Sequence, residues 1–123
     1  MGDIVKVNAT ELRSYNENRF APNPVYQSDG MKVILVYFKQ DQFIPVHAPA
    51  VELVLYVIEG EAEVVTGDER VRAAKDDLII IPKGVKRGVK ALTDLTVLHV
   101  VSPPPSEEDH KKVQAGIMQG KFE

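Results

Sequence analysis

The chain has 123 residues and a formal net charge of −3 at pH 7, a size that suits one domain with its own hydrophobic core. It contains no cysteine, which excludes a disulfide framework, a thiolate zinc site and a cysteine nucleophile. Lysine and arginine residues are scattered, and no apolar run approaches the roughly 18 residues that span a bilayer. We therefore expect a cytoplasmic protein with no nucleic-acid partner and no membrane association.

The first twenty residues carry only a weak structural signal. A short turn is expected around Thr10-Glu11-Leu12. Lys6 stands where a myristoylation signal requires Ser or Thr, so the Gly2 that follows Met1 does not indicate lipidation.

From residue 25 onward the chain consists of short β-rich runs separated by turn residues. The spacing of about 8–12 residues between turns is typical of an antiparallel sandwich or barrel. The predicted strands are 25–27, 31–39, 43–47, 52–59, 61–65, 70–73, 78–81, 85–90 and 95–101. No helix-length segment lies between them, which removes parallel crossovers and predicts an all-β antiparallel fold.

Several of these strands are apolar on both faces, most clearly 33–38, 53–58 and 78–81. The outer face of a small barrel is normally polar, so another layer must cover these side chains. We expect a homodimer. The alternative is that the N-terminal segment, with Tyr15, Phe20 and Val25, folds back over one sheet, and both arrangements can hold together.

The C-terminal region changes character after the last strand. The run Ser102-Pro103-Pro104-Pro105 ends the strand, because proline cannot continue a ladder of hydrogen bonds. Ser106 then has the position of a helix N-cap, and three acidic residues follow it in the first turn. The sequence predicts a short helix over about 106–119, packed on a single-domain barrel whose core covers about 25–103.

Two motifs in the middle of the chain resemble those of the cupin superfamily. The segment 41–61 is similar to the first cupin motif, in which His47 and Gly60 keep the spacing of the shorter form. The segment 75–87 is similar to the second motif and keeps the turn Pro82-Lys83-Gly84, although Asp41 and Asp76 replace motif glycines. The resemblance covers about 31–103 and implies a double-stranded β-helix, or jelly-roll barrel.

In metal-binding cupins, four motif side chains point into the barrel and hold one metal ion. The resemblance places His47, Pro49, Leu53 and Arg87 at these four positions. Proline and leucine have no donor atoms, and a permanently protonated guanidinium repels a cation. His47 is the only retained ligand position, so we expect no metal and no cofactor.

Two further residues offer an irregular replacement for the missing ligands. His99 shares a strand face with Leu95, Val97 and Val101, which points it inward. Together with His47 and Glu52 it would form a set of two histidines and one carboxylate, but Glu52 has the wrong strand parity and needs a bulge to turn inward. His110 is expected in the helix, outside the barrel. The simpler interpretation of His99 is a core histidine bonded to a neighbour.

Arg87 is the most informative of the substitutions. A charge inside a small barrel costs several kcal/mol unless it is paired, and no carboxylate is evident at neighbouring inner positions. We therefore expect Arg87 to hold a carboxylate, phosphate or sugar acid, with His47 adding a hydrogen bond. The expected apolar walls are Leu53, Leu55, Val57 and Ile80. Alternatively, Arg87 extends out of the barrel mouth or pairs with Glu52 or with an acid of a partner subunit.

Whether the protein is an enzyme stays open at this point. Metal-free epimerases of jelly-roll fold pair a His base with a Tyr acid, which makes His47 and Tyr37 candidates, while Tyr56 is expected to face outward. The leading hypothesis is a ligand-binding barrel with His47, Arg87, Leu53, Tyr37 and His99 in its site. The alternatives are a metal-dependent oxygenase or isomerase with an irregular ligand set, an epimerase-like acid–base catalyst, and a module whose cavity is filled by side chains.

Overall fold

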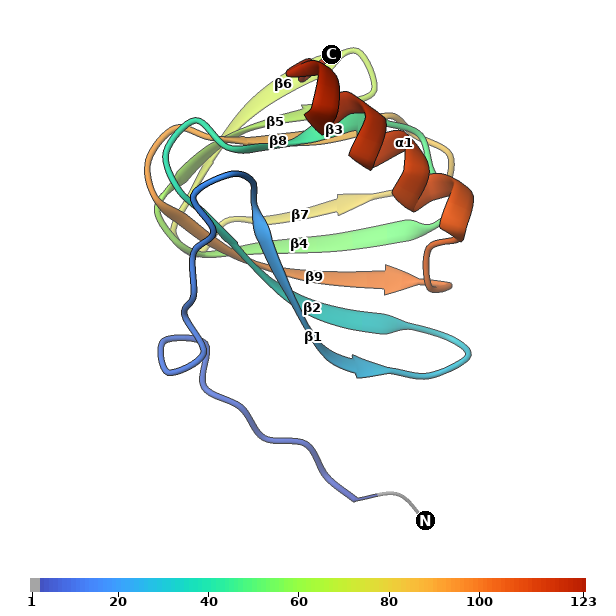
Figure 1. Cartoon of the computed structure of the whole chain (residues 1–123). Coiled ribbons are helices and arrows are strands. Elements are labelled where there is room, and N and C mark those ends of the chain that lie inside the picture. Colours follow the sequence, from blue (N-terminus) through green and yellow to red (C-terminus); the bar gives the residue numbers. More distant parts are fainter. Residues whose placement is uncertain (1–2) are drawn as a thin grey trace.

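The computed structural model describes residues 3–123, which form two antiparallel β-sheets and one C-terminal helix (Figure 1). One sheet has five strands in the order β1-β2-β9-β4-β7, and the other has four in the order β3-β8-β5-β6. The strands are β1 (Ala21–Gln27), β2 (Lys32–Phe38), β3 (Phe43–His47), β4 (Glu52–Glu59), β5 (Glu61–Thr66), β6 (Glu69–Ala74), β7 (Leu78–Ile81), β8 (Arg87–Ala91) and β9 (Leu95–Ser102). The predicted all-β fold is confirmed, and β3, β4 and β7 have the predicted bounds.

Strand alternation directs one apolar face of each sheet into a shared core between them. In β4 the buried positions are Leu53, Leu55 and Val57, while the residues between them are partly exposed. Phe38 and Leu95 are completely buried in the same cluster. Phe20 also packs inside, stacked on Phe38 with ring centroids 5.8 Å apart, and does not cover the outer face of a sheet as expected.

The two positions where motif glycines are replaced keep a glycine-like backbone. Asp41 has φ of 74° and Asp76 has φ of 73°, so both adopt the left-handed conformation. Aspartate tolerates this region better than most residues. The turns of both motifs therefore survive the loss of their glycines.

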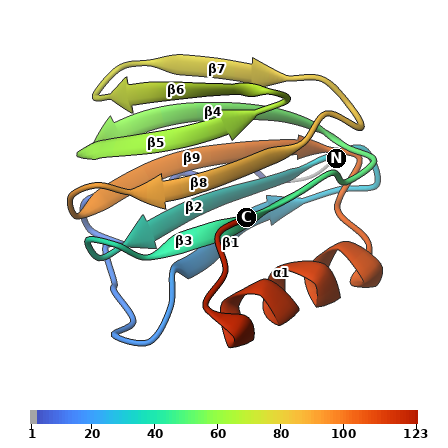
Figure 2. The same ribbon diagram turned by 90° about the horizontal axis from the view of Figure 1, so that it is seen from above.

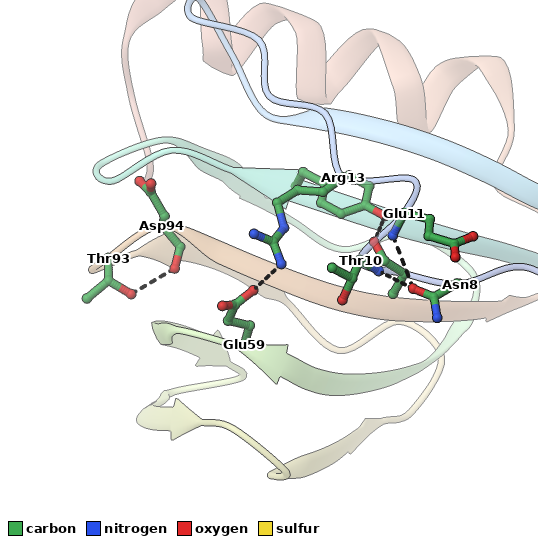
Figure 3. A network of polar contacts seen from close by, with 9 residues as sticks. Asn8, Thr10, Glu11, Arg13, Glu59, Thr93 and Asp94 are labelled. Atoms are coloured by element: carbon green, nitrogen blue, oxygen red, sulfur yellow. Dashed lines mark hydrogen bonds and ion pairs between the residues drawn. The ribbon is translucent and has the colours of Figure 1, made fainter.

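The N-terminal segment folds back over the outer face of β2. The ring of Tyr15 packs edge-on against that of Tyr37, with centroids 6.4 Å apart, and the Tyr37 hydroxyl donates to the Ala9 carbonyl at 2.7 Å. Figure 3 shows how Arg13 reaches Glu59 at the end of β4, with 3.1 Å between Nη2 and Oε2. The expected turn at Thr10–Leu12 is present, and the Asn8 side chain accepts from the Thr10 and Glu11 amides. The predicted cover by this segment thus accounts for part of the apolar outer surface.

The helix α1 (Glu107–Gln119) begins as the sequence predicts. Ser106 is its N-cap, and Ser106 and Asp109 form a reciprocal capping box. The helix lies beside β3 at the edge of the four-stranded sheet (Figure 2). No helix among residues 3–123 is long and apolar enough to cross a membrane.

The outer face of the five-stranded sheet keeps an apolar patch that no part of residues 3–123 fully covers. Ile80 is 64% exposed and Leu78 is 58% exposed, both on the edge strand β7. Cross-strand pairing places Val54 and Tyr56 of β4 directly beside them on the same face. We call Leu78, Ile80, Val54, Tyr56, Leu98 and Val100 the outer apolar patch.

Candidate functional site

A cavity of about 370 Å³ lies between the two sheets, next to α1. Its deep polar residues come from both sheets: His47 from β3, Arg87 from β8 and His99 from β9. The first turns of α1 contribute Asp109, His110, Val113 and Gln114. The cavity is therefore not filled by side chains, and the three polar residues His47, Arg87 and His99 of the predicted site meet in it.

Arg87 opens β8 directly after the turn that follows β7, and only 4% of it is exposed. Its guanidinium bends back to this turn, where Nη2 donates to the Pro82 carbonyl at 2.9 Å and Nε to the Val85 carbonyl at 3.2 Å. Nη1 is buried and has no hydrogen-bond partner among the described residues. Burial lowers the pKa of Arg87, while the negative charge of Asp109 opposes this shift. Arginine nevertheless keeps its charge, because its usual pKa is so high.

Within this chain, Arg87 neither extends out of the barrel mouth nor pairs with Glu52, whereas pairing with an acid of a partner subunit stays a prediction. No ion pair to Arg87 occurs within residues 3–123, and Glu52 is exposed on β4. The side chain stays buried and does not extend into solvent. The structure thus contains a buried cation that is held by two backbone carbonyls and has one donor atom to spare.

His47 ends β3 and stands directly opposite Arg87 in the β3–β8 ladder. Its Nδ1 lies 2.8 Å from the Pro45 carbonyl, and a carbonyl can only accept, so Nδ1 carries a proton. In the neutral ring this leaves Nε2 as an acceptor. Burial lowers the pKa of His47, the Pro45 hydrogen bond opposes this shift, and the charge of Arg87 lowers the pKa further.

His99 lies on the inner face of β9, as its strand parity predicts, and is 8% exposed. Its Nε2 is buried and has no hydrogen-bond partner in the described part of the chain, so the expected bond to a neighbouring core group is not made there. Burial is the main cause that lowers its pKa to about 4, and the charges of Arg87 and His47 add to the effect. His99 is therefore neutral at pH 7.

All four positions that correspond to metal ligands in cupins line the cavity, namely His47, Pro49, Leu53 and Arg87. Pro49 and Leu53 have no donor atom, and Arg87 is a cation. Residues 3–123 contain no group of three His, Cys, Asp or Glu residues placed to hold a metal ion. Glu52 does not turn inward, so it cannot complete a set with His47 and His99. The residues present do not fit the metal centre of metal-binding cupins.

Four residues lie elsewhere than predicted. Tyr37 is 1% exposed but faces away from the cavity, with its hydroxyl bonded to Ala9 under the N-terminal segment. Ile80 faces outward, whereas Leu55 and Val57 are buried in the core away from the cavity. Of the four expected walls, only Leu53 lines the cavity. Tyr56 faces outward as predicted, and its hydroxyl donates to Asp76 at 2.6 Å.

Some lining residues were not anticipated from the sequence. Arg19 and Lys32 add two cations to the rim, and Arg19 donates to the Gln114 side chain of α1 at 2.5 Å. His110 was expected outside the barrel but lines the rim as part of α1. Among the lining residues, three cations (Arg19, Lys32 and Arg87) face one carboxylate, Asp109, which is engaged in the helix cap. The cavity therefore has a surplus of positive charge.

Comparison with known protein families identifies the fold. The model of the cupin domain family matches residues 34–102, which include both motifs and most of both sheets. The chain is a cupin. Among curated proteins, none matches its sequence.

Solved cupin structures resemble this cupin over most of its length. An RmlC-like cupin protein from Desulfovibrio desulfuricans is 32% identical, with a TM-score of 0.76, and the match covers 83% of this chain and 99% of that one. A protein from Thermus thermophilus is 29% identical, with a TM-score of 0.75, and the match covers 82% of this chain and 98% of that one. KdgF from Halomonas sp. shares the fold at 21% identity, with a TM-score of 0.74 and coverage of 88% and 99%.

Proposed function

We propose that this cupin binds a small organic anion in the cavity between its sheets, with Arg87 as the residue that holds the negative charge. The observation that carries the proposal is the buried Nη1 of Arg87, which has no partner within residues 3–123, in a residue that lines the cavity. A buried charge without a counter-ion costs several kcal/mol, and a bound anion removes that cost.

The surroundings of Arg87 support an anion and disfavour a cation. Nε2 of His99 is a second buried polar atom without a partner in the described chain, and it belongs to the same cavity. Arg19 and Lys32 at the rim raise the local concentration of anions. A ligand oxygen between Arg87 and His99 would satisfy both groups at once.

The test is a thermal-shift screen of organic anions, each paired with its neutral amide, on wild type and on Arg87→Met. Arg72→Met is the matched control, because Arg72 is exposed on β6 and pairs with Glu61. We expect at least one anion to raise the Tm of wild type and of the control but not of Arg87→Met. Circular dichroism checks that Arg87→Met is folded.

If no anion stabilises wild type, or if the stabilisation survives in folded Arg87→Met, the proposal is wrong. Arg87→Lys gives a second check. It keeps the charge but loses the planar set of donors, so binding should be weaker and still present.

A second candidate function is acid–base catalysis by His47, and one observation favours it. The Pro45 carbonyl fixes the proton on Nδ1 and leaves Nε2 as a base, in a residue that lines the same cavity as Arg87. NMR in D₂O of any anion that binds would test this function. The catalytic function is supported if wild type incorporates deuterium at the carbon next to the carboxylate and His47→Gln does not. If wild type incorporates no deuterium, proton abstraction from that compound is excluded.

A further inference from the structure

The walls of the cavity are apolar apart from the groups already described. Above Arg87 and His99 they consist of aliphatic side chains from both sheets, chiefly Ile34, Val36, Val51, Leu53, Val89 and Val101. No Ser, Thr, Asn or Tyr within residues 3–123 lines the cavity. The one carboxamide, that of Gln114, already accepts a hydrogen bond from Arg19. A ligand therefore meets mainly hydrocarbon, apart from Arg87, His99 and His47 and the polar groups at the rim.

Few polar atoms of the lining residues are buried without a partner. Arg87 Nη1 and His99 Nε2 are the two buried atoms of the cavity that lack a partner in the described chain. Nη1 donates, and Nε2 donates when the neutral imidazole carries its proton there, so the pair suits the two oxygens of one carboxylate. A phosphate has more oxygens and more charge to satisfy. The hydroxyl groups of a sugar acid would lose their hydrogen bonds to water against these walls, which costs about 1–3 kcal/mol for each group left unsatisfied.

The volume of the cavity limits the size of the ligand. About 370 Å³ is near the lower end of the range for small-molecule sites, which is roughly 300–1,000 Å³. A tail of several carbon atoms fits in such a space, whereas a long lipid chain does not fit without leaving through the rim. The rim carries Arg19 and Lys32, which favour entry of an anion.

From the apolar walls and the two buried, unpartnered nitrogen atoms, we infer that the ligand is a monocarboxylic acid with a medium-length aliphatic or aryl-alkyl tail, bound with its carboxylate on Arg87 and His99. This inference rests on the anion site proposed above. It assigns the ligand to amphipathic carboxylates and not to sugar acids or phosphate.

The test is isothermal titration calorimetry with acetate, butanoate, hexanoate and octanoate, together with glucuronate and inorganic phosphate. While the tail fits within the walls, each buried methylene should tighten binding about fourfold. Glucuronate and phosphate should bind more weakly than hexanoate, and hexanamide should not bind, because it lacks the charge.

A matched pair of wall variants checks where the tail lies. Val101→Thr puts a hydroxyl into the wall at nearly constant volume, and Val71→Thr makes the same change on β6 at a position that is 36% exposed and outside the cavity lining. We expect Val101→Thr to lower the affinity for hexanoate several-fold and to leave that for acetate nearly unchanged. Val71→Thr should alter neither affinity.

The outcomes separate this inference from the proposal on which it rests. If anions bind through Arg87 but affinity is independent of tail length, or if glucuronate or phosphate binds best, the amphipathic ligand is wrong and the anion site stands. Equal effects of Val101→Thr on acetate and hexanoate also contradict it. If no anion binds, both the site and the ligand class are wrong.

Discussion

Arg87 and His99 affect the cavity in different ways. The guanidinium stays charged, so it attracts an anion at any physiological pH. His99 is neutral at pH 7, because burial and the charges of Arg87 and His47 lower its pKa to about 4. An anion placed between the two would favour the protonated form of His99, so its binding becomes stronger as the pH falls.

The lowered pKa of His99 predicts how stability depends on pH. Between about pH 6.5 and 4 the unfolded chain binds a proton on His99 and the folded chain does not, so the free energy of unfolding falls as the pH falls through this window. A shift of this size corresponds to about 3 kcal/mol. Urea unfolding at several pH values measures the loss, in buffers without carboxylate because the site would bind them.

His99→Leu removes this titration and serves as the comparison. The variant should lose clearly less stability than wild type between pH 6.5 and 4, and a smaller slope should remain from His47, whose pKa is also lowered. If the free energy of unfolding depends on pH in the same way in wild type and in His99→Leu, then His99 is not buried in its neutral form.

Sequence reasoning located four of the five candidate site residues in the cavity and misplaced the fifth. His47, Arg87 and Leu53 follow from motif spacing, and His99 follows from strand parity. Tyr37 could not be placed, because β2 is apolar on both faces and its outer residues are buried by the N-terminal segment. Ile80 was misplaced for a related reason, since every residue of β7 is apolar and alternation carries no signal there.

At the scale of elements, α1 docks on β3 through a very close contact. A Cβ added at Gly116 would lie 2.6 Å from both Cβ and Cγ of Pro45, so only glycine permits this approach. The chain after the helix continues the contact, where the Phe122 carbonyl accepts from the Val46 amide at 2.7 Å. Because α1 lines the cavity, this contact also shapes the cavity.

Gly116→Ala tests the docking. Helix propensity alone predicts stabilisation by about 1 kcal/mol, but the collision with the rigid Pro45 ring should outweigh it and give a net loss of about 1–3 kcal/mol. Hydrogen exchange should show reduced protection in α1, with the strands of the five-stranded sheet unchanged.

Gly30→Ala is the control for this variant, because a Cβ there meets nothing within 4 Å. It should change stability by less than about 0.5 kcal/mol. A Gly116→Ala protein that is more stable than wild type, with α1 protection kept or increased, would mean that the close contact does not limit the docking.

The helix shows which parts of an element the sequence determines. Its bounds followed from local signals, namely the Ser106 cap and the acidic first turn. The position of the helix did not follow from local signals, because it depends on the close contact between Gly116 and Pro45, which are far apart in the chain. For this reason the contribution of His110 and Asp109 to the cavity was missed.

At the scale of the whole molecule, the outer apolar patch leads us to expect a homodimer. Ile80 and Leu78 are more than half exposed, and burying such a side chain contributes about 1.5–3 kcal/mol. Sedimentation velocity should give twice the 13.7 kDa chain mass for wild type. Ile80→Lys combined with Leu78→Lys should shift the protein to monomers, because burying two lysines in an apolar interface is costly.

Val71→Lys provides the matched control on the other sheet, where Val71 is also exposed. It should leave the mass unchanged. A monomeric wild type at micromolar concentration would contradict a dimer, and equal disruption by Val71→Lys would place the contact elsewhere.

The architecture as a whole was more predictable than the site within it. The jelly-roll fold and its turns follow from motif spacing that is kept even where Asp41 and Asp76 replace glycine, because aspartate adopts the same left-handed backbone. The strand order within the two sheets comes from the structure. The ligand class could not be predicted in this way. It depends on which side chains remain unpartnered once the sheets meet, as Arg87 Nη1 and His99 Nε2 do.

The most direct measurement is a crystal structure of the protein grown with hexanoate. We predict electron density for the carboxylate within about 3 Å of Arg87 Nη1, next to His99, with the tail along the aliphatic wall. A metal ion held by His47 and His99, or hexanoate bound only outside the cavity, would contradict the proposal that Arg87 makes this barrel an anion site.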